Sequence, residues 1–319
     1  MKRREFVAAA ALLPVLPARA QAQPPLIGVV RVGGSSEEQF APVFRRDLAR
    51  LGFEEGKDYG LKLLFAEGDP TRQPALAAEL VKQGAALLVA FGNAGTVAAQ
   101  HATRDVPIVA MANDLVGARL VASMARPGAN TTGVSIMGHE LEEKRLEVLH
   151  EIVPAARRIG VLADTTTTEK ATLQKLEVSA GRLGLSLTIA EAQKPPEVAA
   201  ALERLDSTKV EAVSVLASPF LNGQRGRLIA EMNRRHWPAM WEWPETVEEG
   251  GLVSYAPRIS LIYRYVAVQV AKVLKGTKPA DLPIEQPTVF TLAINTSAAK
   301  KIGLQVPEAM LLRADVVVD

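Results

Sequence analysis

Residues 26–36 read LIGVVRVGGSS, and this stretch decides the fold. A short apolar run of this kind is typical of a strand buried on both faces of a parallel sheet, and the glycine–serine stretch predicts a loop. After the loop, apolar residues from Phe40 to Leu51 recur at three- and four-residue spacing, which indicates one face of a helix. Strand, loop and amphipathic helix together form the basic unit of an α/β fold.

The same unit recurs along the chain, with helical patterns between most of the apolar runs. Further strands are expected at Leu61–Phe65, Ala86–Phe91, Pro107–Met111, Ile159–Ala163, Leu185–Ala190, Ala212–Leu216, Pro238–Trp241, Leu252–Tyr255 and Thr288–Asn295, and Ala129–Ile136 leads out of the first series. Later helices are expected at Val116–Met124, at about 139–151, 168–183, 196–205 and 221–235, and at Ile262–Leu274. So many strands exceed what one doubly wound sheet holds in a chain of this size.

We therefore expect an α/β protein with two doubly wound, Rossmann-like lobes. The break falls near residues 133–138, where two glycines frame a short segment. The proline-rich tail can cross back between the lobes, which predicts several crossing hinge strands. The expected limits are 23–134 with about 257–285 for the N-terminal lobe, and 135–256 with about 286–319 for the C-terminal lobe.

Residues 1–22 predict an export signal. Three basic residues precede an apolar run from Phe6 to Leu16, which is too short to span a bilayer, and two Ala-x-Ala cleavage sites follow. The Arg3–Arg4 pair fits the twin-arginine route, with an arginine-rich Sec signal as the alternative. The chain has no cysteine, which excludes a lipid anchor on a cysteine. In a bacterium, we expect a periplasmic protein.

Composition and motifs argue against several classes of protein. The 319-residue chain has a net charge of +2, but the leader holds four basic residues and one acidic residue, so the remainder is at −1 and predicts no nucleic-acid binding. The four histidines lack metal-ligand spacing, and no nucleotide-binding or hydrolase motif is complete; Ser297–Lys300 matches only the S-x-x-K part of one. We expect no catalytic residues, no metal and no cofactor.

Small or polar residues follow the carboxyl ends of several predicted strands, where α/β sheets bind ligands. The alternative is that they only cap the following helices. The candidate ligand-binding residues in these loops are Ser35, Ser36, Asn93, Ala94, Thr96, Asn113, Asp114, Asp164, Thr165, Ser218 and Phe220. Among them, a ligand carboxylate is expected at Ser35, Ser36, Asn93 and Thr96, and a ligand ammonium at Asp114.

All three tryptophans fall within residues 237–243. If the strand there continues, Trp241 and Trp243 lie on one side at its carboxyl end and can stack on an apolar ligand. Met240 and Glu242 then lie on the other side. A hydrophobic plug within one lobe is the alternative for this pair and the preferred interpretation for Trp237.

A set of ordered motifs carries a family resemblance. They are AEGDP at 66–70, PALAAEL at 74–80, VG at 116–117 with LVAS at 120–123 and ARPG at 125–128, KRLE at 144–147, GGLVSY at 250–255 and KGTKPADLP at 275–283. With these motifs the chain, from about Leu26 to Asp319, resembles ABC-transporter substrate-binding proteins of the tryptophan/tyrosine-binding type. That family is a branch of the type I periplasmic-binding fold.

The resemblance implies a non-catalytic, monomeric protein whose two lobes close over a small ligand. In that family the ligand is typically an amino acid, often an aromatic one, and it is handed to an ABC permease and its ATPase. For this chain we expect an amino acid or an aromatic acid. The chain departs from the family pattern at Asn93–Ala94, Leu115, Asp164 and the Trp241–Trp243 stretch, so the fold transfers better than the ligand does. The alternatives are a periplasmic ligand sensor for a membrane receptor and a periplasmic enzyme on the same scaffold.

Overall fold

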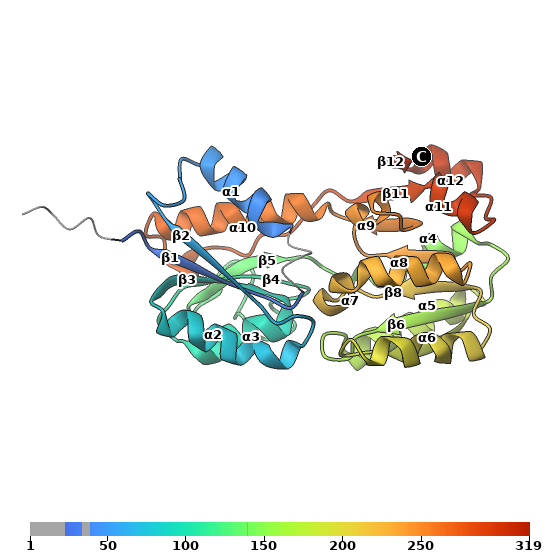
Figure 1. Cartoon of the computed structure of the whole chain (residues 1–319), viewed down its shortest axis with the longest axis horizontal. Helices are drawn as coiled ribbons and strands as arrows, with labels where there is room; N and C mark the ends of the chain where they lie inside the picture. Colours follow the sequence, from blue (N-terminus) through green and yellow to red (C-terminus); the bar gives the residue numbers. More distant parts are fainter. Residues whose placement is uncertain (1–22, 34–38, 139) are drawn as a thin grey trace, which may run out of the picture.

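The computed structural model describes residues 23–33, 39–138 and 140–319. The expected export signal, Ser35 and Ser36 lie outside the described residues. Within them, two sheets covered by helices lie side by side along the long axis of the molecule (Figure 1). This arrangement confirms the predicted α/β fold with two doubly wound lobes. No helix in the described part of the chain is long and apolar enough to cross a membrane.

The N-terminal sheet is wholly parallel and has the order β2-β1-β3-β4-β5. Its strands are β1 (Leu26–Arg31), β2 (Gly60–Phe65), β3 (Ala85–Phe91), β4 (Ile108–Ala112) and β5 (Thr131–Ser135). Helices α2 (Gln73–Lys82) and α3 (Gly92–Ala102) cover one face, and α1 (Phe40–Arg50) and α10 (Ile259–Leu274) cover the other (Figure 1). Because both faces are covered, the inner strands β3 and β4 are apolar throughout.

The C-terminal sheet has the order β12-β11-β10-β9-β8-β6-β7, and only β10 and β11 pair antiparallel. Its strands are β6 (Arg158–Ala163), β7 (Ser186–Glu191), β8 (Ala212–Val215), β9 (Ala239–Trp241), β10 (Val253–Ala256), β11 (Thr291–Asn295) and β12 (Val316–Val318). Its helices are α4 (Glu140–Ile152), α5 (Lys170–Arg182), α6 (Glu197–Ser207), α7 (Pro219–Gly223), α8 (Arg225–Arg234), α9 (Pro244–Glu248), α11 (Thr296–Lys301) and α12 (Glu308–Arg313). The five strands that come first along the chain, β6 to β10, have the order β7-β6-β8-β9-β10, which matches the order of β1 to β5 in the N-terminal sheet.

The chain crosses between the lobes three times: after β5, after β10 and between α10 and β11. Glu285 of the third crossing runs beside β5, since its backbone exchanges hydrogen bonds with Ser135 and Gly133, each of 2.9 Å. Ile136 on the first crossing and Ile259, directly after the second, line the cavity between the lobes. The residue limits of the two lobes stay a prediction.

The prediction of a helix at Val116–Met124 is wrong. Residues 115–119 form turns, because the Asp114 carboxylate accepts hydrogen bonds from the Val116 and Gly117 amides and Arg119 adopts a φ of 56°. The helix expected at 221–235 is two helices, α7 and α8, separated at Gln224. Three short elements, α9, α12 and β12, were not expected, because elements of three to six residues show no clear periodicity.

A candidate ligand-binding site between the lobes

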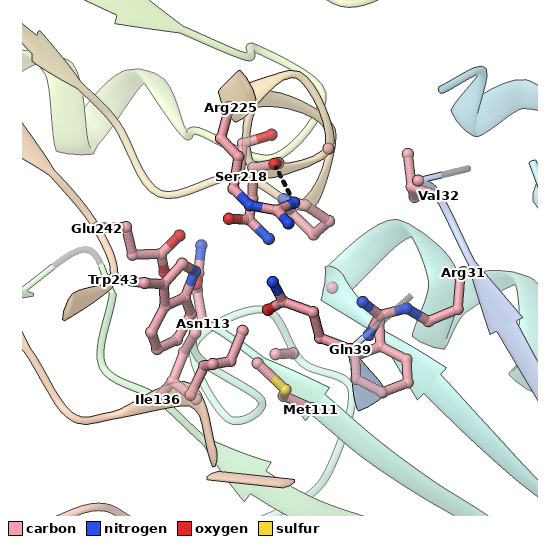
Figure 2. A pocket seen from close by; sticks show the side chains of 18 of the residues that line it. Arg31, Val32, Gln39, Met111, Asn113, Ile136, Ser218, Arg225, Glu242 and Trp243 are labelled. Atoms are coloured by element: carbon pink, nitrogen blue, oxygen red, sulfur yellow. Dashed lines mark hydrogen bonds between the residues drawn. The ribbon is translucent and has the colours of Figure 1, made fainter. Parts of the chain in front are cut away.

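A cavity with about 750 Å³ of free space, open to solvent, lies between the two lobes. The N-terminal lobe and α10 contribute Arg31, Gln39, Phe91, Met111, Asn113 and Tyr263, and the C-terminal lobe contributes Ser218, Asn222, Arg225, Glu242 and Trp243. Figure 2 shows Arg31 across the cavity from Glu242 and Trp243. The lining thus combines aromatic and aliphatic side chains with charged and polar groups from both lobes.

Arg31, the last residue of β1, lies among aromatic rings. Its guanidinium carbon is 4.2 Å from the centroid of the Phe91 ring, 5.9 Å from that of Phe40 and 5.8 Å from that of Tyr263. Its Nη2 donates a 3.4 Å hydrogen bond to the Tyr263 hydroxyl. A cation held over ring faces is stabilised by their quadrupoles. This end of the cavity is therefore both aromatic and positively charged.

Glu242 lies at the opposite end, directly after β9. Burial raises the pKa of its carboxyl to about 8, although Arg145 opposes this shift. The carboxylate of Glu142 adds to the rise, whereas hydrogen bonds from the Ser218 amide and the Trp243 side chain lower it. At neutral pH the ligand-free protein consequently holds Glu242 mostly protonated.

Behind Glu242, α4 supplies a fully buried ion pair. Arg145 Nη1 donates a 2.9 Å hydrogen bond to Glu142 Oε1, and both side chains are 1% exposed. Arg145 also donates to the carbonyl oxygens of Gly138, at 3.2 Å, and Tyr255, at 3.0 Å. Gly138 lies on the first crossing, and Tyr255 lies in β10, directly before the second crossing. The ion pair therefore connects the wall of the cavity to backbone on or next to two of the crossings.

The lobes touch on either side of the cavity. Gln39 Nε2 donates a 2.7 Å hydrogen bond to Glu249 Oε1, which lies beyond α9 in the other lobe. The same carboxylate accepts a 2.7 Å hydrogen bond from Arg225 Nε. An exposed hydrogen bond of this kind adds little to the free energy of folding. Through Glu249, however, it connects Gln39 of the N-terminal lobe to Arg225, which lines the cavity from the C-terminal lobe.

Three glycines lie where the two lobes approach each other closely. A Cβ atom on Gly223 would lie 3.4 Å from the Cα of Gly33, and one on Gly92 would lie 2.9 Å from Pro219 Cγ. Gly92 also has a φ of +73°, which side chains rarely allow. We call Gly33, Gly92 and Gly223 the glycine seam. Larger residues there would hold the lobes apart.

Three of the residues predicted from the sequence line this cavity: Asn113, Ser218 and Trp243. Ser218 also caps α7, since its hydroxyl accepts hydrogen bonds from the Phe220 and Leu221 amides. Ser218 therefore caps a helix and also lines the cavity, so both interpretations given for it in the sequence analysis apply. Trp243 is 4% exposed and belongs to the apolar cluster that also contains Met111.

Other predicted residues lie near the cavity without lining it. Ala94, Asp164 and Phe220 line a smaller neighbouring pocket between the lobes, and the Asp164 carboxylate accepts a 2.6 Å hydrogen bond from Ser218. Thr165 accepts one from Gln193, of 2.5 Å. Asp114 caps its own turn, as described above. Their roles in ligand binding stay predictions.

Asn93 and Thr96 lie at the start of α3. The Thr96 hydroxyl donates a 2.8 Å hydrogen bond to the Gly92 carbonyl, and the residue is fully buried. Asn93 Oδ1 is buried and has no hydrogen-bond partner among the described residues. The expected carboxylate contact of these two residues stays a prediction.

The alternation expected for the tryptophan stretch ends with the strand. β9 stops at Trp241, which packs inside the C-terminal lobe, whereas Glu242 and Trp243 both line the cavity. Sequence reasoning therefore missed Glu242, together with Arg31 and Arg225. A signal was present for Arg31, because a charged residue ending an otherwise apolar strand is placed at the sheet edge where ligands bind.

The comparisons with known proteins fit this geometry. A family model described as ABC transporter substrate binding protein matches residues 29–318. The chain belongs to this family. It is therefore a binding protein for a small ligand and not an enzyme.

Individual relatives of this substrate-binding protein are distant in sequence. A tyrosine-binding protein of Clostridioides difficile is 23% identical over 264 residues, which cover 82% of this chain and 76% of that protein. A Streptococcus pneumonia ABC domain solved in complex with L-Trp has a TM-score of 0.82 at 24% identity and covers 92% of this chain and 100% of that one. A conserved domain protein from Vibrio cholerae also scores 0.82, at 27% identity, with coverage of 92% and 99%.

Proposed function

We propose that this chain is the exported ligand-binding component of an ABC importer and that it acts in the periplasm as a monomer. Residues 1–22 would direct export, by the twin-arginine or the Sec route, and the loaded protein would deliver its ligand to a permease and ATPase in the inner membrane. Family membership and the composition of the leader support this proposal. The ligand would be an amino acid or an aromatic acid held in the cavity between the lobes.

The observation that carries the proposal is that both lobes line one cavity. Aromatic and aliphatic side chains supply surface for an apolar group, and Arg31, Arg225, Asn113 and Ser218 supply polar contacts from two sides. Relatives are named or solved with tyrosine and tryptophan, which have this mixture of a charged head and an apolar body.

Binding would act by hinge closure. A ligand that contacts both lobes stabilises the arrangement in which they meet and gains less from the open one, so it shifts the population towards closure. The Gln39–Glu249 bond and the glycine seam form only when the lobes meet. The three crossings would supply the hinge.

A ligand panel tests this function. The mature protein is heated alone and with L-tryptophan, L-tyrosine, L-phenylalanine and their deaminated acids. A ligand present at a hundred times its dissociation constant stabilises the folded form by about 2.7 kcal/mol, which corresponds to a rise in Tm of several degrees. X-ray scattering of the same samples should show a smaller radius of gyration with ligand. No shift with any compound would refute the amino-acid proposal, and an unchanged radius with bound ligand would refute hinge closure.

A further inference from the structure

The charges around the cavity are unevenly placed. Among the described residues that line it, Glu242 is the one acidic side chain, whereas Arg31 and Arg225 are both basic. Glu242 and Arg225 also share a small adjoining pocket with Ser218 and Trp243, so they belong to the same corner of the site. We call Ser218, Arg225 and Glu242 the head-group corner. Arg31 lies across the cavity from Glu242 and Trp243 (Figure 2), and the Phe91 ring lies next to the Arg31 guanidinium.

We propose that the head-group corner selects a zwitterionic amino acid: Arg225 contacts its carboxylate, and Glu242 releases a proton to solvent as its carboxylate pairs with the ligand ammonium. The inference rests on the proposed function and narrows it to ligands that carry an amine. An α-amino acid bears both charges on one carbon, so it needs an acid and a base at the same end of the site. Its side chain would then extend towards Arg31 and Phe91.

The surroundings of Glu242 explain why the proton leaves only when ligand arrives. From α4 it faces Arg145 and Glu142, but Arg145 is already held by Glu142 and by the carbonyls of Gly138 and Tyr255. Asp164 accepts a hydrogen bond from the Ser218 hydroxyl and is not among the groups that shift the pKa of Glu242. A buried carboxyl with its nearest cation already paired stays neutral. A ligand ammonium supplies the missing positive charge.

The amount of proton released follows from the free protein. With the pKa of Glu242 at about 8, the carboxyl is about nine-tenths protonated at pH 7. If the bound carboxylate is fully ionised, each ligand releases about 0.9 proton at that pH. The apparent affinity then rises about tenfold from pH 6 to pH 7 and levels off above pH 8.

Calorimetry tests the inference. Binding is measured at pH 7 in phosphate and in Tris, whose heats of ionisation differ, with three matched pairs: L-tryptophan and indole-3-propionate, L-phenylalanine and 3-phenylpropionate, and L-leucine and 4-methylpentanoate. The buffer dependence of the heat counts the protons. We expect at least one amino acid to bind more tightly than its deaminated partner, by tenfold or more, and to release about 0.9 proton.

Two variants separate recognition from folding. Glu242→Gln should abolish proton release and the preference for the amine. Glu245→Gln, which changes a half-buried carboxyl three residues away that does not line this cavity, should keep both. If Glu242→Gln does not fold, the wild-type proton count still decides. Binding without proton release, or equal binding of a deaminated acid, would overturn this inference and leave the proposed function standing. No binding by any of the six compounds would overturn this inference together with the amino-acid part of the proposed function.

Discussion

Replacing Glu242 with Gln should make the ligand-free protein more stable at neutral pH. The folded pKa of Glu242 is about 8, well above its ordinary value of 4.5. A carboxyl with a raised folded pKa contributes most stability below pH 4.5, and this contribution is lost as the pH rises towards 8, because the unfolded chain ionises first. A Gln side chain has the same shape as the neutral acid and does not titrate.

The magnitude follows from the width of this window. Each pH unit between 4.5 and 8 lowers the free energy of unfolding by about 1.4 kcal/mol in the wild type relative to the variant. From pH 5.5 to pH 7.5, the variant should therefore gain about 2.5 kcal/mol over the wild type. Carboxyls with a lowered pKa, such as Glu211 and Glu231, have their full effect above pH 4.5 and remain in both proteins.

The assay is urea unfolding followed by tryptophan fluorescence at pH 5.5, 6.5 and 7.5 without ligand. The quantity of interest is the difference between the two proteins at each pH, which cancels every group they share. A difference that stays constant across the three pH values would refute the reasoning, because Glu242 would then titrate alike in the folded and unfolded states.

Three further substitutions test other parts of the structure. Arg225→Gln should weaken ligand binding by about 10- to 100-fold in calorimetry, since a hydrogen bond to a charged group contributes about 1.5–3 kcal/mol. Gly223→Trp should prevent closure and abolish binding while leaving the Tm of the free protein nearly unchanged, because the wedge lies between lobes. Gly133→Ala should lower the free energy of unfolding by about 3 kcal/mol or more in urea, since its Cβ would lie 1.8 Å from the Ala110 carbonyl oxygen.

Matched controls are available in the same chain. Arg227→Gln removes an exposed arginine of α8 that does not line the cavity and should leave affinity unchanged. Gly226→Trp adds the same bulk where nothing lies within 4 Å of a Cβ, and should still bind. Normal binding by Gly223→Trp, an unaffected affinity in Arg225→Gln or a stable Gly133→Ala protein would each contradict the corresponding prediction.

The strands could be predicted from the sequence because parallel strands covered on both faces must be apolar. Runs such as Ala85–Phe91 are then visible without any alignment. The turns at 115–119 were missed because apolar spacing cannot distinguish a helix from a compact loop whose Leu115 and Leu120 are buried. There the Asp114 side chain, which competes for backbone amides, decided the outcome.

The site was predicted at the correct edge of the sheets, but its charged residues were not. Asn113, Ser218 and Trp243 follow strand ends, as ligand-binding residues do in this class of fold. Glu242 was assigned to the far side because strand alternation was extended one residue too far. Arg225 falls inside the single helix expected at 221–235. The apolar spacing does not show the break at Gln224, so the sequence does not indicate that the Arg225 side chain faces the other lobe.

The glycine seam has a thermodynamic consequence. At Gly33 and Gly223, the contact between the lobes is made by backbone atoms alone. Forming this contact therefore restricts no side-chain rotamers and buries little apolar surface. This contact therefore adds little free energy for or against closure. A seam of this kind leaves the position of any opening equilibrium to the other contacts between the lobes and to the ligand in the cavity.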